Sequence, residues 1–359
     1  MKIALLSYST KPRGGVVHTL ALAEALAAAG EDVTVWTLGR GGDSGFFRPV
    51  DPAVRQEIVP FPDVRGEAVG PRILRSIDTL RAAFDPAGYD VVHAQDCISA
   101  NAVSRCVRTV HHVDHFTTPE LIACHERAIR EPFAHVCVSA AVADELRQGW
   151  GIRADVIPNG VDSQRFELAA QDVPGLSRWR SRLGRYVLSV GGIEPRKGTL
   201  DLLEAFALLR KSEPEMRLVI AGGETLFDYR DYRTRFDARA AELGVEPVVL
   251  GPVHHDELPT LVAAASVFAF PSNKEGFGLA AMEALAAGVP VVTRDLPVLR
   301  EVFGTVARFA TEPAGFAAQL RAACADPGSR QAAGRDLAAG YSWDRAAARH
   351  VVLYRGLLG

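Results

Sequence analysis

The stretch from Pro271 to Glu283 constrains the fold more than any other part of the sequence, because it joins two strand-like runs through a glycine-bearing loop and a helix. The apolar run 266–270 precedes it, the Ala/Leu/Met-rich run 279–287 ends it, and the apolar run 289–293 follows. This order of strand, helix and strand predicts a parallel sheet, in which ligands bind beyond the carboxyl ends of the strands. We therefore expect the loop to lie at a binding site.

Two features of this stretch exceed what packing alone requires. Glu283 is the only charged residue in an otherwise apolar helix, and carboxylates are rarely buried without a partner. Gly276 and Gly278 let the backbone approach a ligand closely. Ser272 and Glu275 also match a capping box, but a helix starting there would place both glycines in its first turns at a cost of about 1 kcal/mol each. We therefore favour a ligand-binding loop.

The same strand, glycine loop and helix recur along the chain. The first such unit comprises a strand over 2–7, a loop with Gly14 and Gly15, and a helix over 17–29. A second begins with a strand over 186–190 and a loop that ends in Arg196-Lys197-Gly198. This alternation predicts an α/β protein with doubly wound, Rossmann-like sheets. The first loop lacks G-x-G-x-x-G, so no dinucleotide fingerprint is present.

The chain length predicts two domains. Its 359 residues exceed what one ordinary core accommodates. Turn-forming residues at 158–162 precede a stretch, 164–182, in which no strand is evident. We place the boundary there, with a first domain over 1–163 and a second over 164–342.

Composition excludes several classes of protein. Hydrophobic residues make up 48% and charged residues 23% of the chain, as in folded rather than disordered proteins. A net charge of -3 argues against general nucleic-acid binding. The five cysteines form no C-x-x-C pair and are typical of reduced thiols, so we expect a cytoplasmic protein. No run approaches the ~18 apolar residues of an integral membrane segment.

Two clusters of polar residues need interpretation. A predicted helix over 72–84 carries Arg72, Arg75 and Arg81, most simply as a solvated face, with contact to an acceptor or to a membrane surface as the alternative. Three histidines and an aspartate lie together at 111–115 and suggest metal ligands. A strand alternates its faces, however, so adjacent histidines point apart. We therefore expect no metal site there.

The loops after two strands carry the groups that a nucleotide sugar requires. Arg196 and Lys197 lie between a strand and a helix, where two cations and helix amides form an anion site suited to a diphosphate. Glu283 can accept two ribose hydroxyls, and Glu275 can accept sugar hydroxyls. Because both loops belong to one predicted sheet, these residues indicate a sugar-nucleotide pocket.

These motifs resemble those of glycosyltransferase family 4. Glu275 to Glu283 matches its E-x7-E motif, and 158–162 resembles its interdomain signature. The loop 191–198 is similar to its donor-phosphate loop, and Gly14-Gly15 to its amino-terminal glycine loop. The resemblance spans nearly the whole chain and implies a GT-B fold, in which two doubly wound Rossmann-like domains face each other across a cleft. It also implies that the last helix, 343–359, crosses back to the first domain.

The resemblance implies a retaining transfer of a hexose-type sugar from a nucleoside diphosphate sugar, without a metal or other cofactor. The acceptor would be a sugar, a lipid or a small molecule, and peripheral contact with a membrane stays open. The alternatives are a GT-B epimerase or phosphorylase, or a glycan-binding protein without catalysis. No site for the lysine-bound pyridoxal cofactor of a phosphorylase is evident in the sequence.

The resemblance also assigns roles to residues. Arg196 and Lys197 would stabilise the departing diphosphate, Glu283 would bind the ribose, and Glu275 would lie near the transferred sugar. His111 would contact that sugar, with His112 as the near alternative. The remaining donor-binding residues would act mainly through their backbone: Gly14, Gly15, Val253, Gly276, Phe277, Gly278 and Leu279.

The chain departs from the family pattern at three places. His93-Ala94-Gln95 stands where many relatives have His-x-His, which puts any role of the second position in doubt. Gly191-Gly192 stands where many have Gly-Arg, so one cationic contact is absent. The segment 228–233 is longer and more charged than usual, and a solvated helix is its simplest interpretation.

Overall fold

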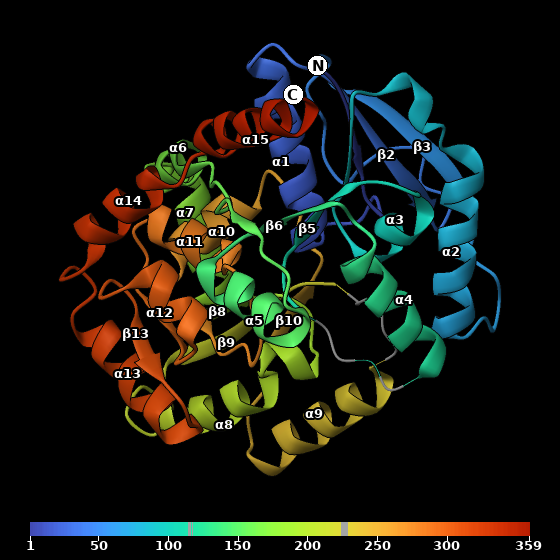
Figure 1. The fold of residues 1–359 in the computed structure, drawn as a ribbon. Coiled ribbons are helices and arrows are strands. Elements are labelled where there is room, and N and C mark those ends of the chain that lie inside the picture. Colours follow the sequence, from blue (N-terminus) through green and yellow to red (C-terminus); the bar gives the residue numbers. More distant parts are fainter. Residues whose placement is uncertain (114–115, 117, 224–228) are drawn as a thin grey trace. The chain divides into compact units, whose positions relative to one another are not determined.

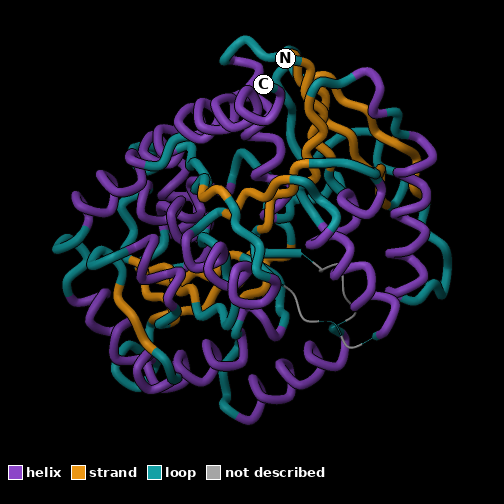
Figure 2. Tube along the Cα trace, in the orientation of Figure 1, coloured by secondary structure: helices purple, strands orange, loops and turns teal. Residues whose placement is uncertain are grey.

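The computed structural model describes residues 1–113, 116, 118–223 and 229–359. The chain divides into two compact units (Figures 1 and 2). The first unit comprises Met1–Gly160 and Trp343–Gly359, and the second comprises Val161–Ser342. The observed border between 160 and 161 lies close to the expected one, and the last helix belongs to the first unit.

The first unit is built around a 7-stranded parallel sheet of order β3-β2-β1-β4-β5-β6-β7. The chain alternates strands and helices, as the sequence predicted, and the last helix, α15, returns to this unit. Its elements are β1 (Lys2–Leu6), α1 (Gly14–Ala28), β2 (Asp32–Arg40), β3 (Arg55–Phe61), α2 (Val69–Ala83), the 3-10 turn η1 (Pro86–Gly88), β4 (Val91–Ala94), α3 (Cys97–Ala102), β5 (Val107–Val110), α4 (Pro119–Arg130), β6 (Ala134–Cys137), α5 (Ala140–Trp150), β7 (Asp155–Val156) and α15 (Trp343–Leu358).

The second unit is built around a 6-stranded parallel sheet of order β10-β9-β8-β11-β12-β13. Its elements are α6 (Ser163–Ala169), α7 (Val173–Leu183), β8 (Arg185–Val190), the 3-10 turn η2 (Pro195–Lys197), α8 (Thr199–Leu209), β9 (Met216–Ala221), α9 (Arg230–Glu242), β10 (Val248–Gly251), α10 (Leu258–Ala264), β11 (Val267–Phe270), α11 (Leu279–Ala286), β12 (Val291–Arg294), α12 (Pro297–Phe303), β13 (Arg308–Ala310), α13 (Pro313–Ala325) and α14 (Gln331–Gly340).

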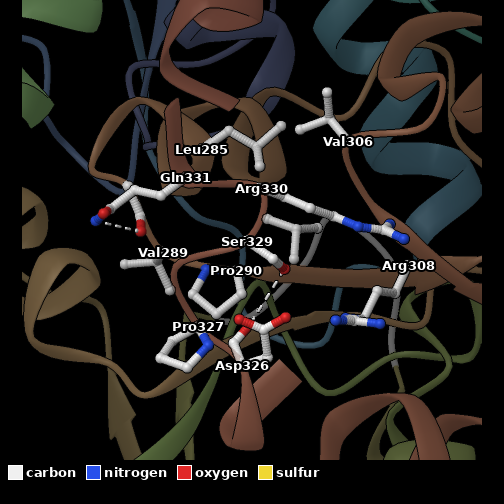
Figure 3. Close-up of a pocket in the computed structure, with 12 residues that line it drawn as sticks. Leu285, Val289, Pro290, Val306, Arg308, Asp326, Pro327, Ser329, Arg330 and Gln331 are labelled. Carbon is white, nitrogen blue, oxygen red and sulfur yellow. Dashed lines mark hydrogen bonds between the residues drawn. The ribbon is translucent and has the colours of Figure 1, made fainter. Parts of the chain in front are cut away.

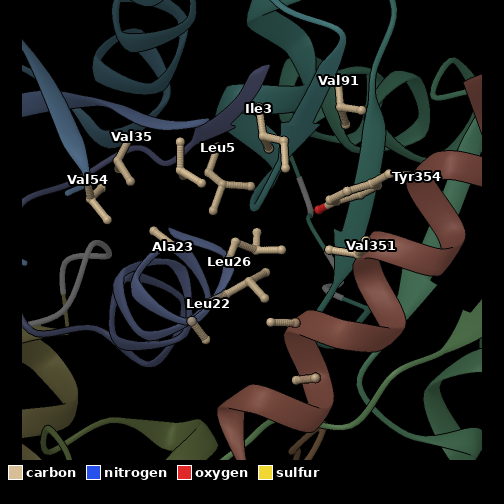
Figure 4. Close-up of a cluster of buried hydrophobic side chains, with 14 of the residues drawn as sticks. Ile3, Leu5, Leu22, Ala23, Leu26, Val35, Val54, Val91, Val351 and Tyr354 are labelled. Atoms are coloured by element: carbon tan, nitrogen blue, oxygen red, sulfur yellow. The ribbon is translucent and has the colours of Figure 1, made fainter. Parts of the chain in front are cut away.

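Helix α15 completes the core of the first unit (Figure 4). Its buried Val351 and Tyr354 point toward the sheet, and the helix runs alongside α1, which contributes Leu22 and Leu26 to the same cluster. Each of these leucines is fully buried, which stabilises the fold by about 2 kcal/mol per side chain. The first unit thus depends on residues from both ends of the chain.

Helix α8 contributes apolar residues at helical spacing to the core of the second unit. Leu202, Leu203, Phe206 and Leu209 are all buried in a cluster that also contains residues of β8, β9 and α13. The stretch 164–182, in which we expected no strand, forms α6 and α7. Strand β10 begins at Val248, a few residues after the turn at Gly244 (φ +60°) that follows α9.

The prediction of a solvated arginine face on α2 is only partly right. The side chain of Arg81 is 54% exposed and pairs with Asp78 on the helix surface. Arg75 instead binds both carboxylate oxygens of Glu67 at 2.7 Å, and its guanidinium lies 3.9 Å from the ring of Phe61. Periodicity alone did not reveal these partners, which come from the loop before the helix and from β3.

Among the helices that the structure describes, none combines the length and the apolar character that crossing a membrane demands.

Candidate functional site

The candidate site of the second unit lies where its sheet changes winding direction. Strands β8 and β11 are neighbours in the sheet, although β9 and β10 lie between them along the chain. The loop after β8, 191–198, and the loop after β11, 271–278, therefore leave the same edge of the sheet. This arrangement is the topological switch point at which doubly wound sheets bind ligands.

Direct backbone contacts join the two loops. Gly198 has φ +62°, and a Cβ atom there would lie 2.2 Å from the carbonyl oxygen of Pro271. The Asn273 N–H donates to the carbonyl of Arg196 at 2.7 Å, and the Asn273 side chain donates to the carbonyl of Pro195 at 3.0 Å. Only glycine fits at position 198, because it alone tolerates both this φ and this proximity.

Four charged side chains form an ion-pair cluster at this edge. Glu275 accepts a hydrogen bond from Lys197 at 2.7 Å and one from Arg196 at 3.2 Å. Arg196 also donates to Glu194 at 3.0 Å. The side chains of Lys197, Glu275 and Glu194 are only 17%, 11% and 8% exposed. The predicted proximity of the two loops thus brings Glu275 against both cations.

For both Glu275 and Lys197, burial and the neighbouring opposite charges shift the pKa in opposite directions. Burial would raise the pKa of Glu275, but the neighbouring charges of Lys197 and Arg196 outweigh it and bring the pKa to about 2. For Lys197, burial lowers the pKa despite the opposing charge of Glu275. Glu275 is therefore ionised at neutral pH and holds the two cations close together.

Helix α11 presents an uncapped amino terminus to the same place. Its N-cap is Gly278, in the left-handed conformation with φ +98°, and no side chain caps the first turn. A Cβ atom at Gly278 would lie 3.0 Å from the ring of Phe303. The capping-box interpretation is therefore wrong, because the helix begins at Leu279 rather than beside Ser272. Its free N–H groups and dipole favour an anion.

The residues between Glu275 and the helix present mainly backbone. Gly276, Phe277 and Gly278 are buried, and the Phe277 ring packs edge-on against Tyr341 at 5.2 Å between centroids. The Phe277 side chain therefore holds the loop in place, whereas Leu279, which opens the helix, is half-buried.

Glu283 lies in the second turn of α11 and faces α6. Burial raises its pKa to about 7, Arg165 opposes this shift, and Asp162 adds to it. Among the described residues, no hydrogen bond or ion pair holds its carboxylate. The structure thus contains the nearly unpartnered carboxylate that the sequence indicated.

Val253 follows β10, the outermost strand of this sheet beside β9, and is half-buried. The neighbouring loops are tightly packed, since a Cβ atom at Gly222 would lie 2.3 Å from the backbone of Gly191, and one at Gly223 would lie 3.0 Å from Pro252. Backbone groups therefore dominate this part of the edge.

The predicted residues of the first unit gather at the start of α1. The helix begins at Gly14 with Gly15 next, and its N-cap residue, Arg13, makes no capping hydrogen bond through its side chain. A Cβ atom at Gly15 would lie 3.7 Å from Nε2 of His111. The structure thus places His111 against the glycine loop, as a shared site would require.

His111 belongs to a buried histidine pair. Its ring lies edge-on to His18 with 4.7 Å between centroids, and its Nε2 has no hydrogen-bond partner among the described residues. Burial, together with the charges that His112 and Arg108 would place nearby, lowers the pKa of His111 to about 3. His18 Nδ1 bonds to the side-chain oxygen of Asn159 at 2.9 Å. The interdomain signature is therefore tied to α1 through Asn159.

The structure explains the role of His93, the first residue of the segment 93–95 that departs from the family pattern. His93 is fully buried and bonds to the hydroxyls of Tyr354 at 2.6 Å and Thr109 at 2.8 Å, so it joins α15 to β4 and β5. Gln95 is 1% exposed, and neither atom of its amide has a partner in the described part of the chain. The structure gives no account of this amide.

The histidine cluster at 111–115 and the charged segment 228–233 each lie partly outside the described residues. Of the histidine cluster, Asp114 and His115 lie outside the described residues, as does Asp228 at the start of the charged segment 228–233. Helix α9 begins at Arg230 and continues that segment. No group of three or more His, Cys, Asp or Glu side chains among the described residues has the geometry of a metal site.

Arg294 is a site residue that the sequence did not reveal. It ends β12, is 9% exposed, and donates twice to the carbonyl of Pro271, from Nε at 3.1 Å and from Nη2 at 2.9 Å. It also binds Asp201 of α8. It thereby fixes the start of the loop 271–278. The sequence indicated only that an arginine ends an apolar strand.

A small hollow in the second unit lies away from these groups (Figure 3). Its lining residues Pro290 and Val291 precede or begin β12, at the sheet edge opposite the carboxyl ends. Its volume of about 10 Å³ accommodates no more than one water molecule. It is therefore not a substrate pocket.

Comparison with known proteins gives concordant results for both units. The family described as Glycosyltransferase Family 4 matches residues 12–165, and the one described as Glycosyl transferases group 1 matches residues 181–336. The D-inositol 3-phosphate glycosyltransferase of Salinispora arenicola (strain CNS-205) is 30% identical over 408 residues, covering 96% of this chain and 89% of that protein.

Solved structures share the fold at low sequence identity. Sucrose-phosphate synthase from Thermosynechococcus elongatus has a TM-score of 0.80 at 20% identity and covers 99% of both chains. Anabaena HepE in complex with UDP-glucose has a TM-score of 0.77 at 19% identity and covers 99% of this chain and 100% of that one. The chain therefore belongs to glycosyltransferase family 4 and has the GT-B fold of two Rossmann-like domains.

Proposed function

We propose that this glycosyltransferase moves a hexose from a nucleoside diphosphate sugar to an acceptor with retention of anomeric configuration and without a metal ion. One observation carries the proposal: Glu275 holds Arg196 and Lys197 together beside the uncapped amino terminus of α11. The complex of HepE with UDP-glucose supports a donor of this class.

The charge cluster suits a departing diphosphate. Glu275 and Glu194 pair with the two cations in this structure, and we propose that the phosphates of the donor compete with these carboxylates for Arg196 and Lys197. As the bond between the sugar and the diphosphate breaks, negative charge grows on the leaving oxygen, and a nearby buried cation stabilises it strongly. Lys197 and Arg196 are the groups that we propose contact this oxygen and its neighbours.

Glu283 is proposed to bind the ribose. Its ionised carboxylate has no hydrogen-bond donor among the described residues, and two adjacent hydroxyls would supply two. Ribose binding would therefore satisfy a carboxylate that the unliganded protein leaves unsatisfied. Val253 and its neighbours are proposed to bind the base through backbone groups, and Gly276, Gly278 and Leu279 to bind phosphate and sugar.

The chemistry of Glu275 favours transfer on one face of the sugar. A carboxylate with a pKa of about 2 that binds two cations is a poor proton donor and a weak base at neutral pH. The two-carboxylate route of glycosidases is not part of this proposal, because Glu275 is a poor acid and Glu283 is proposed to bind the ribose. In the proposed step the acceptor oxygen attacks the anomeric carbon as the phosphate oxygen leaves from the same face, and the acceptor proton passes to that phosphate oxygen.

His111 is proposed to act as a neutral hydrogen-bond partner of a sugar hydroxyl. Its pKa of about 3 keeps it uncharged at pH 7, and its Nε2 has no partner among the described residues. Gly14 and Gly15 leave the backbone beside it open to a ligand. Replacing His111 by alanine is expected to lower transfer more than it lowers nucleotide affinity.

A panel of nucleoside diphosphate sugars tests the proposal. The chosen donor should raise the melting temperature and be slowly hydrolysed, and proton NMR of the first product should show the anomeric configuration of the donor. An inverted product would refute the retaining mechanism. Interconversion of the donor with its epimer, or reaction only with a sugar phosphate, would favour the epimerase or the phosphorylase instead.

A further inference from the structure

At the carboxyl edge of the sheet in the first unit, no described carboxylate forms a hydrogen bond or an ion pair with Arg40. Arg40 ends β2, where its Nε donates to the carbonyl of Tyr8 and its Nη2 donates to Oγ of Ser76, both at 2.9 Å. Its guanidinium also lies 5.1 Å from the ring of Phe61 and 5.3 Å from that of Tyr8. The side chain is thus fixed by neutral groups, and its Nη1 makes no hydrogen bond to a described residue.

The surroundings of Arg40 contain further positive charge. Burial lowers the pKa of Arg40, Tyr8 and Asp96 oppose this effect, and the charges of Arg72 and Arg75 add to it. Arg75 is neutralised by its bidentate pair with Glu67. Buried cations in proteins are almost always paired with a carboxylate or another anion, and Arg40 forms no such pair within the described chain.

Neither nearby carboxylate forms a hydrogen bond or an ion pair with Arg40 among the described residues. Asp96 uses Oδ1 to cap α3 through the N–H of Ser99 at 2.8 Å, and its charge acts on Arg40 only from a distance. Asp43 is held by Thr10 and Lys11. The half-buried guanidinium therefore keeps Nη1 available for an external anion.

The position of Arg40 is where a ligand is expected. In the order β3-β2-β1-β4-β5-β6-β7 the winding changes between β1 and β4. Tyr8 follows β1 and Asp96 follows β4, so both lie at the switch point, and Arg40 contacts the first and interacts electrostatically with the second. Ligands of doubly wound sheets bind in this crevice.

We propose that Arg40, with Arg72 beside it, binds a phosphate group carried by the acceptor, so that the natural acceptor is a phosphorylated sugar or polyol. A phosphomonoester carries close to two negative charges at neutral pH and presents three oxygens to a guanidinium fork. A carboxylate would bring only one charge to a place where the charges of Arg40 and Arg72 act on each other. The inference rests on the proposed glycosyl transfer and adds to it the class of the acceptor.

Binding of inorganic phosphate to the full-length protein tests the subsite without any acceptor. The proposed donor site also binds phosphate, so titrations are made in the Lys197→Gln background. There, Arg40→Gln is expected to weaken phosphate binding at least tenfold. Arg81→Gln, on the same helix as Arg72 but paired with Asp78, is expected to change it less than twofold. Equal affinity with and without Arg40 would overturn the inference.

Circular dichroism and urea unfolding establish whether Arg40→Gln folds. If it does not, Arg72→Gln decides in the same background: a weakening of severalfold supports the subsite, and no change refutes it. Binding of nucleoside diphosphate to the wild type, lost in Lys197→Gln, tests the donor site separately, so failure of one proposal is not mistaken for failure of the other.

Transfer assays then test the acceptor class. With the donor established, sugars or polyols bearing a phosphate are expected to be glycosylated at a kcat/KM at least a hundredfold above that of their unphosphorylated counterparts. Equal use of the neutral and the phosphorylated acceptor would refute the assignment, even if phosphate binds at Arg40.

Discussion

Replacing Glu283 by glutamine should stabilise the unliganded protein at alkaline pH while weakening its hold on nucleotide. The folded structure disfavours the ionised form of Glu283, because burial raises its pKa to about 7 and no described residue donates a hydrogen bond to it. Above pH 7 the protein must nevertheless carry this charge. Glutamine keeps the shape of the side chain and removes the charge.

The sign and size of the effect follow from proton linkage. The pKa of Glu283 is about 7 when folded against an ordinary value of 4.5, so its contribution is fully present below pH 4.5 and is lost as pH rises through 7. A shift of this size corresponds to about 3 kcal/mol at 1.36 kcal/mol per pH unit. This is an upper limit, because the side chain is partly exposed to water.

Equilibrium urea unfolding between pH 5 and pH 9 measures this difference. The stability of Glu283→Gln relative to wild type should rise by about 2–3 kcal/mol from pH 5 to pH 9. Glu167→Gln, an exposed position on α6, serves as the matched control and should stay within about 0.5 kcal/mol of wild type throughout. A difference curve for Glu283→Gln that is flat in pH would refute the reasoning.

The same variant also tests whether the charge of Glu283 is needed for nucleotide binding. If the charge is retained because it binds ribose, Glu283→Gln should bind nucleoside diphosphate at least tenfold more weakly at pH 8, since an amide offers one acceptor oxygen in place of two. Wild-type affinity should also fall as pH drops below 7. Unchanged calorimetric affinity in the variant would leave the ribose assignment without support.

Four further outcomes are expected. Lys197→Ala should lower donor turnover by about 10²–10³-fold, as loss of one transition-state charge contact does elsewhere, with an unchanged circular dichroism spectrum; full turnover would contradict its proposed role. Because the pKa of Glu275 is depressed to about 2, its stabilising contribution should be lost as pH falls from 4.5 through 2. The stability of Glu275→Gln, measured by acid unfolding, should not show this loss. EDTA should leave transfer unchanged, whereas loss that Mn²⁺ restores would contradict a metal-free reaction. Burial lowers the pKa values of His93 and His350, so stability should fall by about 1.4 kcal/mol per pH unit per histidine below pH 6.5, and a stability constant from pH 6.5 to pH 5 would argue against their neutral burial.

The pairing of distant loops could be predicted from sequence because parallel sheets impose it. Two loops that leave neighbouring strands must emerge at the same edge, so glycines, cations and carboxylates in such loops are brought together whatever the packing beneath them. That rule placed Lys197 near Glu275 before any coordinates. It did not reveal their direct ion pair, which depends on side-chain rotamers.

Other features required the folded structure. Arg294 and Arg40 both end strands, and periodicity treats a terminal arginine as solvent-exposed. Their true environments come from Pro271 and Ser76, which lie 23 and 36 positions away in the sequence. Similarly, nothing local marks Tyr354 as the partner of His93, because that contact depends on how the last helix packs against a sheet formed by the first part of the chain.

The contact between Tyr354 and His93, 261 positions apart, has a consequence for biosynthesis. The second unit is continuous in sequence, and its last residue leaves the ribosome before α15 does. The first unit begins synthesis earlier but must wait for α15 before His93 gains the Tyr354 hydroxyl and Leu22 and Leu26 gain their apolar neighbours. Domains usually fold in the order of their synthesis, whereas here the amino-terminal domain is the last to be completed. A nascent chain stalled just short of Trp343 would therefore carry all of the second unit and a first sheet that still lacks the apolar neighbours supplied by α15.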